Sequence, residues 1–353
     1  MKRSALATAA LVLGALVIAG AATACTRILW NTNSVAVISS RSMDWWGSSQ
    51  PRLHVLPRGM RKSGAFMGSR RLVAQNPARW TSRYGSVVTS AYGTAVPDGM
   101  NEKGLAAHGL WLRGTDYGPR DASRPGVHIG LWVQYILDNA ASVDQALSLA
   151  GRIQPVPADH QGINIPLAFS IEDRAGDSAI IEYHDGQAVV YRGRDYRVMA
   201  NTPMARAQAI VATFDFTNAT RNATLPGNTN SVDRFVRASF YIDFLGRTAP
   251  RNRWEAAAAL MSVARNVSDP IGAPGDEPGE TDETDYRTLS DLTNRSYSFE
   301  LALRLATLRT DLRRLDFRAG QPARSLNPAN ANLNGDVTNI YRPSTSPPPG
   351  VRR

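Results

Sequence analysis

Cysteine is almost absent from this sequence, since Cys25 is the only one in 353 residues. A single thiol forms no intramolecular disulfide, so the fold has to be stabilised by its hydrophobic core. Zinc sites that use several cysteines are excluded for the same reason, and the five histidines show no spacing typical of metal ligands. We therefore expect neither a metal nor another cofactor.

Lysine is also scarce and occurs only at Lys2, Lys62 and Lys103, so the formal net charge of +10 rests almost entirely on arginine. The arginines are scattered along the chain. They form no block interleaved with aromatic residues, which is the pattern of a nucleic-acid groove. We expect a solvated, arginine-rich surface and no nucleic-acid partner.

Long apolar runs are missing beyond the first 24 residues. A basic start, a short apolar run and the small residues Ala22 to Ala24 together predict a signal peptide over residues 1–24. A membrane-spanning helix needs about 20 apolar residues, so no membrane span is expected. The mature protein would then begin at Cys25 and be periplasmic or secreted. The alternative is a lipoprotein anchored through Cys25, although Ala22 stands where a lipobox usually has leucine.

Patterns typical of strands and of helices follow each other in blocks. Strand patterns fill most of residues 27–112 and return over 166–201, with a last hairpin pair over 286–301 around Thr293 and Asn294. Helical patterns cover 127–140, 142–153, 232–246 and 253–267, and the second of these begins with a Ser-x-x-Gln capping box. This order predicts an α+β fold in which helices cover antiparallel sheets, because a doubly wound parallel sheet would alternate strictly.

No repeat and no linker divides the mature chain. We expect one domain over residues 25–326, followed by a tail over 327–353 that is rich in asparagine and proline and partly disordered.

Cleavage before Cys25 would place a thiol and a free amine on one residue. A cysteine nucleophile acts as a thiolate, and its ordinary pKa of about 8.5 calls for a nearby base or cation. An α-amino group titrates near pH 7.7–8.0, so it can accept and return a proton close to neutrality. Cys25 is therefore a candidate catalytic nucleophile that removal of the preceding residues would activate.

The sequence resembles the choloylglycine hydrolases, the family of bile salt hydrolases and penicillin V acylases within the N-terminal-nucleophile hydrolases. The matching motifs are Cys25-Thr26, Arg41-x-x-Asp44, DGMNEKGL at 98–105, MANTP with Asn201, and DRFVRASF with Arg234. The resemblance covers most of the mature chain. It implies an αββα sandwich, in which two antiparallel sheets are flanked by helices, and a homotetramer.

The resemblance also implies roles for these residues. Arg41 would favour the Cys25 thiolate, which suits a permanently charged guanidinium, and Asp44 would bind the free amine. The Asn201 side chain would stabilise the oxyanion together with the backbone N–H of Trp111, and Arg234 would be a second active-site arginine. The implied reaction is hydrolysis of a linear, non-peptide amide in a small N-acyl substrate.

Tryptophan distinguishes this chain within the family. Trp111 stands where bile salt hydrolases have asparagine, and Trp45 and Trp46 follow Asp44. This pattern is similar to the Gram-negative branch, which cleaves penicillin V and N-acyl homoserine lactones, and it predicts a pocket for an aromatic or aliphatic acyl group. Bile salt hydrolysis is the alternative.

A second alternative concerns the catalytic base. A conventional Cys–His dyad would use His108 or His184 in place of the free amine.

Overall fold

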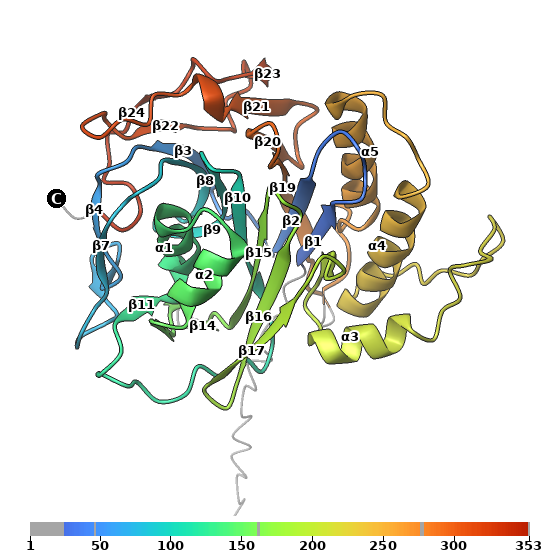
Figure 1. Cartoon of the computed structure of the whole chain (residues 1–353), viewed down its shortest axis with the longest axis horizontal. Helices are drawn as coiled ribbons and strands as arrows, with labels where there is room; N and C mark the ends of the chain where they lie inside the picture. Colours follow the sequence, from blue (N-terminus) through green and yellow to red (C-terminus); the bar gives the residue numbers. More distant parts are fainter. Residues whose placement is uncertain (1–24, 46, 161–162, 276–278, 352–353) are drawn as a thin grey trace, which may run out of the picture.

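The computed structural model describes residues 25–45, 47–160, 163–275 and 279–351, so the expected signal peptide lies outside the described residues. Two large sheets are stacked face to face, and helices cover both outer faces (Figure 1). The α+β prediction and its αββα arrangement are confirmed.

The first sheet, called the β1 sheet, carries Cys25 at the start of β1. In spatial order its strands are β18 (Val198–Met199), β1 (Cys25–Trp30), β2 (Ile38–Trp45), β19 (Glu283–Asp291), β20 (Ser296–Leu301), β21 (Thr307–Asp311) and β23 (Gly335–Asp336). Among its described strands, β21 and β23 pair in parallel and the others are antiparallel. The register of β1 on β2 sets Cys25 opposite Met43 and Arg27 opposite Arg41.

The second sheet, called the β10 sheet, faces the β1 sheet and is antiparallel throughout its described strands. In spatial order it contains β17 (Gln187–Arg192), β16 (Ser178–His184), β15 (Leu167–Asp173), β10 (Leu105–Trp111), β9 (Ala95–Asn101), β8 (Ser86–Ala91), β3 (Arg52–Leu56), β22 (Arg324–Leu326) and β24 (Arg342–Pro343). Most residues of β10 and β15 are buried, because one face meets the β1 sheet and the other meets helices.

The helices fall into two groups. Helices α1 (Trp132–Asn139) and α2 (Val143–Ala150) pack on the β10 sheet, while α4 (Ser231–Leu245) and α5 (Arg253–Asn266) pack on β1 and β2, with α3 (Met204–Val211) against α4 (Figure 1). One buried apolar cluster fills the space between the sheets and under α4 and α5, and a second lies under α1 and α2.

Short elements complete the fold around the two large sheets. The two-stranded pairs are β4 (Arg61–Ser63) with β7 (Arg79–Thr81), β5 (Phe66–Met67) with β6 (Arg70–Arg71), β11 (Gly126–His128) with β12 (Gln154–Val156), and β13 (Asp159–His160) with β14 (Ile163–Asn164). Two 3-10 turns span Ile129–Leu131 and Leu312–Arg314.

Several local predictions are confirmed. Ser142 caps α2 by accepting a hydrogen bond from the Gln145 N–H at 3.3 Å. The hairpin expected over 286–301 is the pair β19–β20, and the first of the expected strands form the antiparallel pair β1–β2. The helix expected over 127–140 is shorter, because its first residues form strand β11 and a 3-10 turn before α1 begins at Trp132.

The C-terminal segment, expected from the sequence as a partly disordered tail, contributes two short strands to the sheets. Strand β23 extends the β1 sheet beside β21, and β24 pairs with β22 in the β10 sheet. Val337 and Tyr341 are buried, and the Tyr341 hydroxyl is hydrogen-bonded to Thr310 at 2.8 Å. Apolar side chains spaced among the asparagines and prolines thus dock residues 327–351 against the two sheets.

A buried polar network joins the two sheets at His108 of β10. Its Nδ1 contacts the Asp98 carboxylate, and its Nε2 lies 2.7 Å from Glu172 Oε1. From the β1 sheet, Tyr297 donates to Asp98, and Arg27 lies 3.4 Å from Glu172. Burial alone would lower the pKa of His108, but the carboxylates of Glu172 and Asp98 raise it to about 9.

This network predicts a pH dependence of stability. The folded-state pKa of His108 lies above its ordinary value near 6.5, so its stabilisation is complete below about pH 6.5 and is lost as the pH rises through 9. We expect the free energy of unfolding to fall by up to about 3 kcal/mol across this window. Urea denaturation at pH 6, 7.5 and 9 measures the slope, which His108→Gln should flatten. An equal slope in both proteins would contradict the prediction.

Candidate active site

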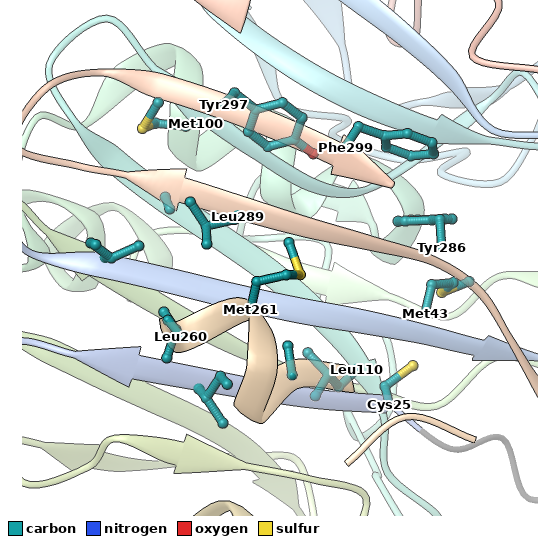
Figure 2. Packing of buried hydrophobic residues seen from close by; sticks show 14 of the residues in the cluster. Cys25, Met43, Met100, Leu110, Leu260, Met261, Tyr286, Leu289, Tyr297 and Phe299 are labelled. Carbon is teal, nitrogen blue, oxygen red and sulfur yellow. The ribbon is translucent and has the colours of Figure 1, made fainter. Parts of the chain in front are cut away.

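Cys25 is buried at the beginning of β1, between the two sheets. Its exposed fraction is 2%, and its sulfur lies at the edge of the apolar cluster that contains Met43, Leu110 and Tyr286 (Figure 2). An apolar cavity opens beside it, so the thiol faces a space that a substrate can enter.

Arg41 is the cation nearest to the sulfur. It stands on β2, next to β1, and its Nη2 lies 3.5 Å from Cys25 Sγ. The same nitrogen donates to the Gly109 carbonyl at 3.1 Å, and Nη1 donates to the Tyr286 hydroxyl at 2.9 Å. These bonds to three different strands fix the guanidinium beside the thiol.

Burial raises the pKa of the Cys25 thiol, and this effect outweighs the opposing influence of the Arg41 and Arg234 guanidinium groups and of the Asp44 backbone N–H. In the full-length chain the nitrogen of Cys25 belongs to a peptide bond with Ala24. An ammonium at this nitrogen would add a positive charge a few bonds from the sulfur and would favour the thiolate. In the full-length chain the raised pKa therefore favours the protonated thiol.

Arg234 of α4 reaches the same residue from the helical layer. Its Nη1 donates to the Cys25 carbonyl at 2.8 Å and to the Thr26 hydroxyl, and its Nη2 donates to Asn201 Oδ1 at 2.9 Å. Its Nε donates to the Thr229 carbonyl at 2.7 Å. The guanidinium thus fixes the backbone at the start of β1 and the orientation of the Asn201 amide.

Asn201 lies directly beside the Cys25 nitrogen. Its Oδ1 accepts a hydrogen bond from Cys25 N at 2.6 Å, and its Nδ2 donates to the Trp111 carbonyl at 2.7 Å. An amide nitrogen carries two hydrogens, so this bond leaves the second one for another acceptor. Asn201 therefore contacts both Cys25 and the strand that carries Trp111.

Asp44, on β2, is buried close to Arg234. Its carboxylate accepts hydrogen bonds from the hydroxyls of Ser42, at 2.9 Å, and Thr284, and it lies 3.9 Å from Arg234 Nη1. In the described structure the Cys25 nitrogen donates to Asn201 and not to Asp44. Burial raises the pKa of Asp44, against the lowering effect of Arg234.

The backbone of Trp111 points toward the site. In the ladder between β10 and β15, the N–H of Leu112 donates to the Pro166 carbonyl at 2.9 Å. Because alternate residues of an antiparallel strand point to opposite sides, the N–H and carbonyl of Trp111 point away from β15. The carbonyl indeed meets Asn201.

The side chains of Trp45 and Trp111 form one wall of the cavity beside Cys25. Their rings meet edge to face, with centroids 5.9 Å apart and an interplanar angle of 66°. The cavity has a volume of about 90 Å³. Its other walls include Met43, Met67 and Ile129. Trp46 lies outside the described residues.

In the described structure the Cys25 sulfur is hydrogen-bonded to Arg41 and both candidate histidines of the alternative Cys–His dyad are bonded to carboxylates. Both ring nitrogens of His108 contact carboxylates, and His184, at the end of β16, pairs with Glu182 at 3.1 Å. The sequence prediction also missed Tyr286, which binds Arg41, and Thr284, which binds Asp44. No sequence signal pointed to either residue, because the pairing of β2 with β19 brings them to the site.

The described ranges contain neither a candidate metal site nor a candidate membrane-spanning helix. Within them, no group of His, Cys, Asp or Glu residues is placed to hold a metal ion. Within the same ranges, no helix combines the length and the apolar character needed to cross a membrane.

The stacked sheets between helical layers, with a cysteine at the start of an inner strand, define the fold of the N-terminal-nucleophile hydrolases. The linear amide C–N hydrolases of the choloylglycine hydrolase family match residues 25–319. The chain therefore belongs to this family and is a hydrolase of linear amide C–N bonds, as the resemblance implied.

Relatives with known structures or names agree with this assignment. Penicillin V acylase from Pectobacterium atrosepticum is 33% identical over 96% of this chain and 94% of that protein. The structure of penicillin V acylase from Agrobacterium tumefaciens is similar with a TM-score of 0.78 and 36% identity, covering 91% of this chain and 98% of that one. A mutant conjugated bile acid hydrolase from Clostridium perfringens has a TM-score of 0.73 at 18% identity, covering 86% and 96%, and shares the fold.

Proposed function

We propose that this protein is an exported N-acyl amidase that cleaves penicillin V, N-acyl homoserine lactones or both, with Cys25 as an N-terminal nucleophile. The observation that carries the proposal is the Cys25 thiol, which lies 3.5 Å from a fixed guanidinium at the edge of an apolar cavity. The two relatives named penicillin V acylase support the choice of substrate class.

The proposed reaction begins with attack of Cys25 Sγ on the acyl carbon, while the thiol proton passes to the free amine of the same residue. The second N–H of Asn201 Nδ2 and the N–H of Trp111 stabilise the tetrahedral oxyanion. The ammonium then protonates the leaving nitrogen as the C–N bond breaks. Water, deprotonated by the amine, hydrolyses the thioester and regenerates Cys25.

The size of the cavity favours compact acyl groups over steroids. An engineered protein cavity of about 150 Å³ accommodates benzene, whereas the space beside Cys25 is about 90 Å³. Methionine side chains adapt their shape easily, so Met43 and Met67 can yield to a single ring or to an alkyl chain. A four-ring bile acid would need a much larger change, and Trp45 and Trp111 occupy the space.

Export of a free-thiol enzyme, and not of a lipoprotein, is part of the proposal. The Cys25 sulfur faces inward against Arg41, and a lipid attached to it would have to leave through the substrate cavity. Mass measurement and N-terminal sequencing of the exported protein test this point. Unmodified Cys25 at position one supports the periplasmic or secreted enzyme, and a diacylglyceryl adduct would overturn it. The expected homotetramer stays a prediction that light scattering checks.

A side-by-side assay of the mature protein tests the substrate. We expect cleavage of penicillin V or of a long-chain acyl homoserine lactone with a kcat/KM well above that for glycocholate. A higher kcat/KM for glycocholate would support the bile salt alternative. Cleavage of none of the three amides would refute the proposed substrates.

Trp111→Leu should change acyl selectivity without removing the backbone N–H. Loss of the ring widens the cavity, so we expect kcat/KM for penicillin V to fall about 10- to 100-fold, mainly through KM. The ratio of long-chain acyl homoserine lactone to penicillin V cleavage should rise. Trp254→Leu, at a half-exposed tryptophan of α5, is the matched control and should leave both rates unchanged. Equal losses on every substrate would contradict a role in acyl selection.

A further inference from the structure

A second buried carboxyl, Asp269, flanks Arg234. Asp269 follows α5 and has an exposed fraction of 2%. Its Oδ1 lies 3.7 Å from Arg234 Nε, whereas Asp44 Oδ2 lies 3.9 Å from Arg234 Nη1. The guanidinium is therefore placed between two carboxyl groups. Neither of these two distances is a hydrogen bond, since the donors of Arg234 are directed to neutral oxygens.

Asp269 is tied to Asp44 through a shared hydroxyl. The Asp269 backbone N–H donates to Thr284 Oγ1 at 2.9 Å, and that hydroxyl donates to the Asp44 carboxylate. The Oδ1 atom of Asp269, however, has no hydrogen-bond partner in the part of the chain that the structure describes. Buried polar atoms without partners are rare in folded proteins and call for an explanation.

The charges around Asp269 explain its unpartnered oxygen. Burial and the neighbouring Asp44 raise the pKa of Asp269 to about 8, against the lowering effect of Arg234. Three buried carboxyl groups, those of Asp44, Asp269 and Asp282, therefore lie around Arg234 and Arg237. Cleavage before Cys25 would create an ammonium on the residue whose carbonyl Arg234 holds at 2.8 Å, and so would add one positive charge beside this group.

We propose that Asp269 is a positioning residue for Cys25, acting through Arg234: its carboxylate lies beside the guanidinium and favours the ammonium form of the mature N-terminal amine. The inference rests on the proposed role of Cys25 as an N-terminal nucleophile. Asp269 itself contacts neither the sulfur nor the acyl group in this proposal.

Charged and titratable groups on the neighbouring strands and helices surround both Asp269 and the Cys25 thiol. Those that act on Asp269 are Asp44, Arg234, Asp282 and Arg237. Those that act on the Cys25 thiol are Arg41, Asp44 and Arg234, and Tyr286 of β19 lies within its influence. None of these groups changes in an Asp269 variant, so a change in titration reports the loss of the Asp269 charge.

The direction of the expected pH shift follows from the negative charge of Asp269. The new ammonium lowers the pKa of Asp269 and so favours its carboxylate form in the mature enzyme. Removing a negative charge makes a nearby ammonium or thiol lose its proton more readily. In Asp269→Asn we therefore expect both limbs of the pH profile of kcat/KM to move to lower pH, by about half to one unit.

The test uses the mature full chain and two readouts. The first is the pH profile of kcat/KM on penicillin V. The second is the pH dependence of Cys25 alkylation by iodoacetamide, which needs no substrate. Asp269→Asn and Asp269→Ala should shift both profiles alike, and Asp269→Glu should restore them. Asp291→Asn is the matched control, because it removes a buried carboxyl at the far end of β19.

The outcomes separate this inference from the proposed function. Unmoved alkylation profiles in whichever neutral variant folds would overturn the role of Asp269, even if its kcat falls. A shift equal to that of Asp291→Asn would overturn it as well. A shifted alkylation profile in a protein that does not cleave penicillin V would support Asp269 and refute the proposed substrate.

Discussion

Mature protein carrying Cys25→Ala is expected to lose its amidase activity by on the order of 10⁴-fold or more, because no other group can form the acyl intermediate. In the described structure Cys25 lines the cavity, and its thiol sulfur lies 3.5 Å from the Arg41 guanidinium. Alanine fits the same buried position, so circular dichroism and thermal unfolding should show a folded protein. Undiminished cleavage of the preferred amide would refute the mechanism.

A second form of the protein tests the role of the free amine while keeping the thiol. A chain that begins at Ala24 keeps Cys25 but leaves its nitrogen in a peptide bond, so it should be as inactive as Cys25→Ala. The measurement is the initial rate of the two forms and of the chain that begins at Cys25. Equal rates for the Ala24 and Cys25 forms would show that the free amine is not the proton carrier.

Asn201→Ala is expected to lower kcat by about 100- to 1,000-fold with a much smaller change in KM, as for the loss of an oxyanion donor elsewhere. The substitution also removes the acceptor for the Cys25 nitrogen and for Arg234 Nη2. Steady-state kinetics on the preferred substrate measure the separate effects on kcat and KM.

Asn31→Ala is the matched control for this asparagine. Asn31 follows β1 at its other end, is buried, and donates to the carbonyls of Gly176 and Arg194 at 2.8 and 2.9 Å. We expect lower stability and unchanged kcat in this variant. If the two variants lose similar amounts of kcat, Asn201 acts on the fold and not on the oxyanion.

The sequence predicted the features that local patterns or motifs determine. Ser142 and Gln145 marked the start of α2, since a capping box depends on a few adjacent residues. Apolar periodicity located α4 and α5, and small polar residues located the turn between β19 and β20. The family motifs supplied the site residues, because nothing in composition distinguishes Arg41 from the other arginines.

The missing part of the site depends on tertiary pairing. Thr284 and Tyr286 reach Asp44 and Arg41 only because β19 pairs with β2 in a particular register, which no local pattern specifies. The orientation of the Asn201 amide also depends on tertiary structure, because contacts with Arg234 and Trp111 set it. The strands β23 and β24 were not predicted, because the few apolar side chains of the tail are informative only when the surface that receives them is known.

The pairing of β2 with β19 has a consequence for the timing of activity. The hydroxyl of Thr284 reaches Asp44 across 240 residues of chain. Contacts of such sequence separation form late in folding, because a long loop has to close first. A nascent or proteolysed fragment that ends before β19 therefore carries the thiol but lacks the contacts of Thr284 and Tyr286 with Asp44 and Arg41. We expect such incomplete chains to have no amidase activity.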